Sequence, residues 1–199
     1  STRVRSSAAS DVYKRQVVTE RDANWWSLRA QSLQCNELEK GYFNSGVLLI
    51  NTLAWAQESV SAKAMSMLAD KAVVSRLTYM DQDILNLILL GKVKFIDAKY
   101  NTQFSLNYEL KKSFICPIND ETVLIHYVGP TKPWHYWAGY PSAQPFIKGK
   151  EASPWKNEPL MRPMNSNYAR YCAKHNFKQN KPINGIMNYI YYFYLKIIK

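Results

Sequence analysis

The stretch YFNSGVLLIN, residues 42–51, decides how the surrounding chain is interpreted. Val47 to Ile50 form a short apolar run suited to a buried strand, whereas Asn44-Ser45-Gly46 before it is typical of a tight turn. We expect a buried strand over residues 43–51 with the turn at its mouth. The apolar run has a structural explanation, and the polar turn is a candidate for function.

Helical and strand patterns alternate around this stretch. Apolar spacing predicts a short helix or turn over residues 24–33 and a helix over 61–68, capped by Ser59 or Ser61. It also predicts a helix over 80–90 that Gly91 closes. Residues 93–96 and 123–126 are rich in apolar and β-branched residues and read as short strands. This alternation predicts an α/β fold.

Three segments are expected along the chain. Residues 1–16, rich in Ser and Arg, lack periodicity and are interpreted as a non-native leader. Residues 17–145 carry the α/β pattern, although prolines after Tyr127 favour an irregular wrap there. Residues 146–199 are basic and aromatic, and we expect one or two helices broken at Pro182.

Composition and cysteine use bound the class of protein. The chain has 199 residues and is 47% hydrophobic, which suits a folded domain with a real core. Its apolar runs are shorter than the roughly 18 residues that a membrane span needs. Three widely spaced cysteines without a C-x-x-C pair favour a reducing cytoplasm.

A formal net charge of +11 predicts an anionic partner. No acidic residue follows Glu158, and the basic residues of the tail are interleaved with tyrosines. This pattern favours an anionic membrane surface, but a solvated helix face with tyrosines packed on the core explains it equally well. No zinc-finger, RNP or helix-turn-helix pattern accompanies the charge, so nucleic acid is not an expected partner.

Two of the three polar clusters involve amides and carboxylates. Asn44 can donate to and accept from a sugar hydroxyl or a phosphate, and a satisfied Asn-Gly turn is the simpler explanation. Asp81, Gln82 and Asp83 open the helix over 80–90, where at least one aspartate serves to cap free N–H groups. The sequence D-x-D invites a metal assignment, but its position at a helix start does not favour one. A carboxylate beside an amide suits the binding of vicinal hydroxyls.

The third cluster is HYVGPTKPW, residues 126–134. His126 leaves a strand, Gly129 permits close approach of the backbone to a ligand, and Lys132 follows within reach of a phosphate. A second class of function is a sugar-binding module without catalysis, in which aromatic rings act as stacking platforms. The candidate rings are Trp134, Tyr136, Trp137 and Tyr140.

FNSGVLLIN, YMDQDILN and HYVGPTKPW, in this order, resemble the family 8 glycosyltransferases. The stretches KYNTQFSLNYELKKS and WHYWAGYPSAQPF narrow the resemblance to the enzymes that add glucose or galactose to the lipopolysaccharide core. Among these, the 1,2-glucosyltransferases are favoured, and a 1,3-galactosyltransferase is the alternative. The resemblance covers Val17 to the C-terminus and implies the C-terminal part of a GT-A-type, Rossmann-like fold with a basic helical extension.

The resemblance also implies roles for individual residues. Asn44 contacts the donor sugar, Asp81 holds its hydroxyls, and Gln82 lies beside the anomeric carbon. His126 ligates manganese (or magnesium), and Gly129 and Lys132 bind the diphosphate of UDP-glucose or UDP-galactose. On the acceptor side, the implied residues are Tyr79, Thr102 and Gln103.

One departure from the family pattern concerns the metal. The family's nucleotide-binding half carries its own D-x-D, and residues 1–16 contain nothing like it. We therefore expect an upstream segment to supply the remaining metal ligands, and negligible turnover by this chain alone. The resemblance places the enzyme at the cytoplasmic face of the bacterial inner membrane, where a lipopolysaccharide acceptor is assembled.

Overall fold

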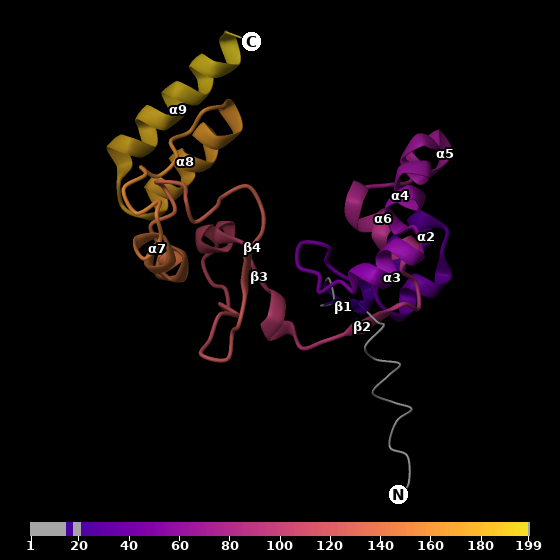
Figure 1. Cartoon of the computed structure of the whole chain (residues 1–199). Coiled ribbons are helices and arrows are strands. Elements are labelled where there is room, and N and C mark those ends of the chain that lie inside the picture. The colour runs from indigo at the N-terminus through magenta and orange to yellow at the C-terminus, as the bar shows by residue number, and fades with distance from the viewer. Residues whose placement is uncertain (1–14, 18–20, 199) are drawn as a thin grey trace, which may run out of the picture. The chain divides into compact units, whose positions relative to one another are not determined.

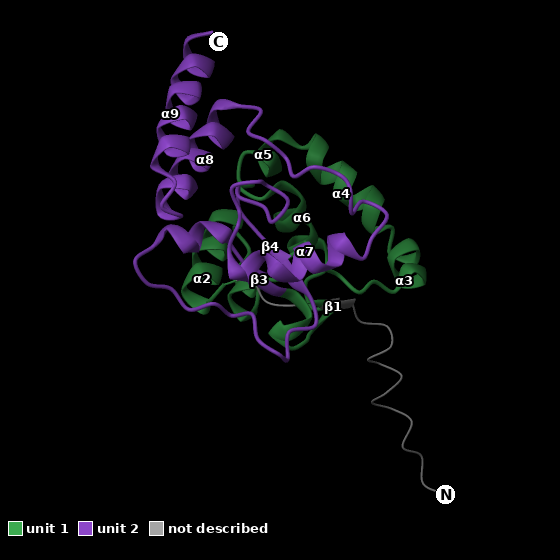
Figure 2. Ribbon diagram, turned by 90° about the vertical axis from the view of Figure 1, so that its left-hand side faces the viewer, with its two compact units in different colours: residues 1–101 green, residues 102–199 purple. Residues whose placement is uncertain are grey.

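The computed structural model describes residues 15–17 and 21–198, and these fall into two compact units, residues 1–101 and 102–199 (Figures 1 and 2). Of the predicted leader, Arg15 and Gln16 belong to strand β1, and residues 1–14 lie outside the described residues. Each unit has its own core and is described by itself.

Unit 1 is mainly helical and contains a two-stranded parallel sheet. Its elements are β1 (Arg15–Val17), α2 (Ala23–Leu33), η1 (Asn36–Lys40), α3 (Thr52–Gln57), α4 (Val60–Ala69), α5 (Lys71–Val74), α6 (Met80–Ile88), β2 (Val93–Phe95) and η2 (Ala98–Asn101). Strand β1 pairs with β2 so that Val17 lies opposite Phe95. Val17 packs in a core with Phe43, Val60 and Leu89, which ties the sheet to α4 and α6.

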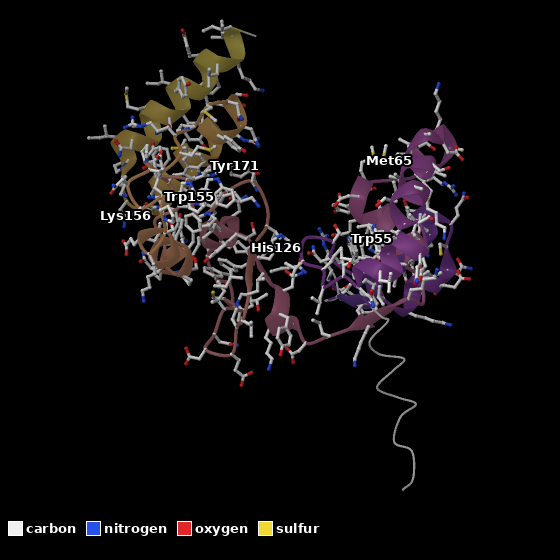
Figure 3. The ribbon with its side chains drawn as sticks, in the orientation of Figure 1. Trp55, Met65, His126, Trp155, Lys156 and Tyr171 are labelled. Atoms are coloured by element: carbon white, nitrogen blue, oxygen red, sulfur yellow. The ribbon has the colours of Figure 1, made fainter. Side chains whose placement is uncertain are left out.

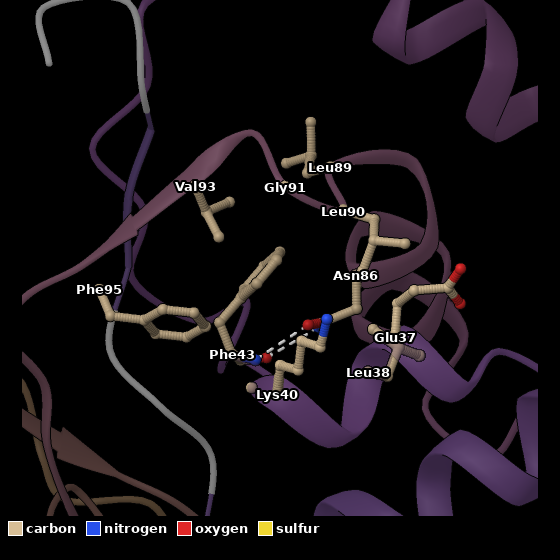
Figure 4. A pocket seen from close by; sticks show the side chains of 11 residues that line it. Glu37, Leu38, Lys40, Phe43, Asn86, Leu89, Leu90, Gly91, Val93 and Phe95 are labelled. Carbon is tan, nitrogen blue, oxygen red and sulfur yellow. Dashed lines mark hydrogen bonds between the residues drawn. The ribbon is translucent and has the colours of Figure 1, made fainter. Parts of the chain in front are cut away.

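The strand expected over residues 43–51 is wrong. Within this described stretch, only Phe43 and Leu49 make single bridges, and no ladder forms. The side chain of Asn86, on α6, makes two hydrogen bonds with the backbone of Phe43 (Figure 4). The Phe43 N–H donates to Asn86 Oδ1, and Asn86 Nδ2 donates to the Phe43 carbonyl, both at 2.9 Å. Leu49 is 63% exposed. Asn86 thus satisfies one backbone donor and one acceptor at Phe43, and the turn and bend at residues 45–47 separate the two bridges.

The helices are placed close to where apolar spacing predicts them. α2, α4 and α6 correspond to the patterns at 24–33, 61–68 and 80–90, and Gly91 follows α6 with φ of +70°. The predicted serine cap of α4 is wrong. Ser59 stands at the cap position in the left-handed region and its side chain caps nothing, while Ser61 Oγ accepts from Trp55 Nε1.

Unit 2 combines a second parallel strand pair with a helical C-terminal part. Its elements are β3 (Thr102–Phe104), η3 (Leu106–Leu110), β4 (Ile125–Tyr127), η4 (Pro141–Ala143), α7 (Gln144–Glu151), α8 (Ser166–Lys178) and α9 (Pro182–Ile197). β4 begins two residues later than predicted. The break at Pro182 is confirmed, because α9 begins there, where its missing N–H is not needed. Phe104 and Leu106 form the core with Ala138 and Tyr140.

Candidate active site

Gln82 lies at the centre of the candidate site in unit 1. Its Oε1 accepts hydrogen bonds from Asn44 Nδ2 at 3.2 Å and from the backbone N–H of Ser45 at 3.1 Å. Asn44 and Gln82 are both buried, with 6% and 8% of their surface exposed. The turn at residues 44–46 and the first turn of α6, two separate clusters in the sequence, are therefore joined directly.

Asp81 belongs to the same cluster but faces solvent. Its Oδ2 accepts from Ser45 Oγ at 2.9 Å, and the residue is exposed. The turn thus holds Gln82 through one N–H and Asp81 through one hydroxyl. A buried amide and an exposed carboxylate stand side by side, a combination that can donate to and accept from ligand hydroxyls.

Asp83 is different because it is fully buried and its hydrogen bonds are internal. Its Oδ2 accepts from Arg29 Nη2 at 2.7 Å and from the backbone N–H groups of Thr78 and Tyr79 at 2.8 Å, and its Oδ1 accepts from Tyr42 OH at 2.5 Å. Burial and the neighbouring carboxylate raise the pKa of Tyr42. The expectation that an aspartate caps the start of α6 is confirmed for Asp83.

Four residues that complete this cluster were not predicted from the sequence. Asn101 Nδ2 donates at 3.0 Å to Asn44 Oδ1, which also accepts from the Gly46 N–H, so the Asn44 amide is fixed in orientation. The other three are Arg29, Tyr42 and Asn86. Of these, Arg29 could have been suspected. It lies beside Ala30 on the buried side of α2, and a buried charge needs a partner.

Tyr79, predicted on the acceptor side, borders the cluster and is 37% exposed. Its ring lies 5.8 Å from that of Trp25, and the Arg29 guanidinium lies 5.7 Å from its centroid. The ring is therefore supported on α2 and leaves an edge in solvent.

In unit 2, Gly129 shows why its position requires glycine. Its φ is +81°, and a Cβ built there would lie 2.8 Å from Ser105 Oγ. Both the left-handed conformation and the close approach exclude a side chain. The loop after β4 can therefore bring its backbone next to a ligand.

His126 and Lys132 line one groove of about 660 Å³, together with Trp134 and Phe146. Figure 3 shows His126 on its strand. Lys132 Nζ donates to the Tyr127 carbonyl at 2.5 Å, and burial lowers the pKa of this lysine. A partly desolvated ammonium gains from an adjacent anion, so the groove suits a phosphate group.

The backbone around Lys132 is held by two histidines. The Lys132 N–H donates to His135 Nδ1 at 3.1 Å, and the His135 N–H donates to the Lys132 carbonyl at 3.0 Å. The neighbouring Thr131 is fully buried, and its hydroxyl lies 3.1 Å from Nε2 of His175 on α8. His175 Nδ1 in turn lies 2.7 Å from Tyr140 OH. Helix α8 thereby helps to hold the loop that presents Lys132.

Thr102 and Gln103 lie on β3, where Gln103 is the register partner of His126 on β4. Thr102 is buried, and Gln103 is half-buried. The predicted acceptor-side pair is thus placed beside the predicted metal ligand.

Family 8 and GT-A enzymes generally use a divalent metal ion. In residues 15–17 and 21–198, however, no group of three His, Cys, Asp or Glu side chains is arranged to hold one. Asp83, the second carboxylate of D-Q-D, is occupied by Arg29 and Tyr42. The described residues therefore do not form a complete metal site.

Two of the four rings proposed as stacking platforms are inaccessible. Trp137 is 1% exposed and Tyr140 is 8% exposed, and both pack inside unit 2. Trp134 and Tyr136 remain accessible, but the hydroxyl of Tyr136 accepts from Asn188 Nδ2. The aromatic cluster is mainly a core.

A family model for glycosyl transferase family 8 matches residues 10–138, and a model for the C-terminal part of glycosyl transferase family 8 matches residues 140–196. The chain belongs to glycosyl transferase family 8. Lipopolysaccharide glucosyltransferase WaaO of Escherichia coli is 54% identical over 182 residues, which cover 91% of this chain and 54% of that protein. Lipopolysaccharide 1,3-galactosyltransferase of Salmonella typhimurium is 50% identical over 183 residues, which cover 92% of this chain and 54% of that protein.

A lipopolysaccharide 1,2-glucosyltransferase of Escherichia coli is 38% identical over 167 residues, covering 81% of this chain and 49% of that protein. The chain spans about half the length of the curated family 8 relatives it matches. Among solved structures, galactosyltransferase LgtC with donor and acceptor sugar analogues has a TM-score of 0.54 at 24% identity, over 73% of this chain and 54% of that one. This likeness confirms the predicted α/β fold of GT-A type.

Proposed function

We propose that this chain is the C-terminal part of an enzyme that transfers a hexose from a UDP-sugar to the lipopolysaccharide core with retention of configuration. Relatives named as lipopolysaccharide glucosyl- and galactosyltransferases support the reaction class. The observation that carries the proposal is the cluster in which one turn holds both Gln82 and Asp81. Such a cluster binds hydroxyls and offers a neutral carbonyl where positive charge develops.

In this proposal the residues of unit 1 handle the sugar. Asp81 accepts hydrogen bonds from sugar hydroxyls through its exposed carboxylate, and Asn44 adds an amide from the turn. The carbonyl of Gln82 stabilises the oxocarbenium-like carbon of the transition state without being a strong nucleophile. Asn44 and Ser45 set the orientation of this carbonyl, so it is preorganised.

The residues of unit 2 handle the diphosphate. Lys132 supplies a cation whose partial burial favours an anionic neighbour, and Gly129 lets the loop backbone approach the phosphates. His126 would contribute one imidazole to a bound Mn²⁺ or Mg²⁺, which neutralises charge on phosphate oxygens. The other ligands would come from outside the described residues.

The donor is UDP-glucose or UDP-galactose, since relatives of both kinds match the chain. We also propose that the enzyme works at the cytoplasmic face of the bacterial inner membrane, where such an acceptor is assembled. A sugar-binding module without catalysis loses support, because Trp137 and Tyr140 are buried.

The test uses a chimaera in which the N-terminal half of the Escherichia coli glucosyltransferase WaaO precedes residues 17–199. We expect manganese-dependent transfer from one of the two UDP-hexoses to a truncated lipopolysaccharide core, with retained anomeric configuration by NMR. The unextended chain serves as the control and should turn over negligibly. A well-folded chimaera that transfers neither hexose would refute the proposal.

A further inference from the structure

Helix α8 (Figure 1) supports the loop that carries Lys132 through two histidines, and His135 is the first of them. The ring centroid of His135 lies 4.2 Å from that of Trp137 and 5.0 Å from that of Tyr168 on α8. His135 is 1% exposed, and its Nδ1 accepts from the Lys132 N–H at 3.1 Å. The backbone of Lys132 is therefore bonded to a ring that packs against α8.

The second histidine, His175, lies on α8 and is fully buried. Its Nε2 lies 3.1 Å from Asn107 Oδ1, and its Nδ1 lies 2.7 Å from the hydroxyl of Tyr140. Burial lowers the pKa of His175 to about 4, so the ring is neutral at neutral pH and carries one proton. Because the oxygen of an amide only accepts, this proton is on Nε2, and Nδ1 accepts from Tyr140. Asn107 and Tyr140 thus determine the tautomer and the orientation of the imidazole.

Thr131 connects His175 to the loop. Its hydroxyl lies 3.1 Å from Nε2 of the imidazole and, since the proton is on this nitrogen, the hydroxyl accepts from it. Thr131 is fully buried and immediately precedes Lys132 in the chain. Pro130 and Pro133 restrict the backbone on either side of this pair. The loop is therefore anchored from its inner side, next to the residue that carries the ammonium.

The ammonium of Lys132 lies on the other side of the loop, in the groove of about 660 Å³ that His126 also lines. Its Nζ donates to the Tyr127 carbonyl, so the backbone and the tip of this lysine are both held. Thr131 and His175 are too deeply buried to contact a ligand in the groove. A loop that is ordered before its ligand arrives loses little conformational entropy on binding, which strengthens the binding of an anion.

We propose that Thr131 and His175 are positioning residues for the diphosphate of the donor. They hold the loop in the conformation in which the Lys132 ammonium and the backbone at Gly129 face the same anion, and they act through the loop rather than by contact. This inference rests on the proposed function, which assigns the groove to a diphosphate. It extends the donor site to α8, in the basic C-terminal segment that the sequence had not linked to the donor.

Titration of the purified chain with inorganic pyrophosphate tests the inference, with binding followed by the phosphorus NMR signal of the ligand. Thr131→Val keeps the shape of the side chain but removes the hydroxyl, and the His175 proton keeps Asn107 as its acceptor, so circular dichroism should show an intact fold. The dissociation constant for pyrophosphate should rise about tenfold, because the loop loses one buried hydrogen bond. Thr131→Ser restores the hydroxyl and should stay within about threefold of the parent chain. Thr52→Val, at an exposed threonine of unit 1, is the matched control and should leave the affinity unchanged.

Tyr140→Phe removes only the hydroxyl that orients Nδ1 of His175, and it should weaken pyrophosphate binding about threefold. Equal affinity of Thr131→Val and the parent chain would overturn the inference, even if the thermal midpoint falls, because the hydroxyl would then serve stability alone. A parent chain that does not bind pyrophosphate, or whose binding survives Lys132→Gln, would overturn it as well. In the chimaera, Thr131→Val should raise KM for the UDP-hexose about tenfold and leave KM for the acceptor unchanged. A chimaera that transfers no hexose, although Thr131 still governs pyrophosphate binding by the chain, would refute the proposed function and leave the positioning role intact.

Discussion

Replacement of Asp83 by asparagine tests the buried ion pair with Arg29 that holds the start of α6 in unit 1. The carboxylate is fully buried and pairs at 2.7 Å with Arg29, whose side chain is 8% exposed. Asp83→Asn keeps the shape but removes the charge, which leaves the guanidinium buried without its counter-ion. Arg29 also donates to the hydroxyls of Ser32 and Thr78, but these acceptors carry no charge that could replace the carboxylate.

Breaking a buried ion pair by removing one partner costs about 3–5 kcal/mol. We therefore expect exchange of the α6 backbone amides to become about 150- to 5,000-fold faster, measured by hydrogen exchange and mass spectrometry. The surface pair Glu58–Lys92, 2.9 Å apart and partly exposed, provides the control. Glu58→Gln should cost less than about 1 kcal/mol. If Asp83→Asn and Glu58→Gln accelerate exchange equally, Asp83 does not anchor α6.

Three further predictions concern stability and positioning. Gly129→Ala should destabilise the fold by about 1–3 kcal/mol and lower the thermal midpoint, because of the positive φ and the contact with Ser105. Adding Ser105→Gly should recover part of this loss. An unchanged midpoint in Gly129→Ala would contradict the positive φ assigned to Gly129. Burial lowers the pKa of His175 to about 4, so between pH 6.5 and 4 the unfolded state binds a proton that the folded state does not. The free energy of unfolding should therefore fall by on the order of 3 kcal/mol as the pH is lowered from 6.5 to 4. Urea titrations of His175→Gln should show a weaker dependence of this free energy on pH. Asn101→Leu removes a donor to Asn44 and should reduce kcat of the chimaera with little change in unfolding; a changed KM alone would argue against a positioning role.

Local sequence patterns correctly predicted those elements whose local preferences match the conformation that they adopt in the folded unit. α6 follows from its apolar spacing and from acidic residues at its start, and the break at Pro182 follows from the missing N–H of proline. The strand predicted over 43–51 is reduced to single bridges at Phe43 and Leu49, because a turn and a bend at residues 45–47 interrupt it, and Asn86, over forty residues away, satisfies the Phe43 backbone through its side chain. The turn was visible in the local sequence, but the contact with Asn86 was not.

The same distinction applies to the site. Asn44, Asp81 and Gln82 were chosen for their chemistry, and the structure brings them together. Arg29 and Asn101 were missed because their importance depends on which buried groups they face, which is a property of the folded unit. Burial also separated the aromatic residues into core and surface, which composition could not do.

The most direct test of the account is the kinetics of Gln82→Ala in the chimaera. We predict that kcat falls at least 100-fold while KM for the UDP-hexose changes less than threefold, because the carbonyl acts on the transition state rather than on donor binding. Gln31→Ala, an exposed amide on α2, is the matched control and should behave like the parent chimaera. A kcat unchanged by Gln82→Ala would contradict the assignment of this cluster as the site of transfer.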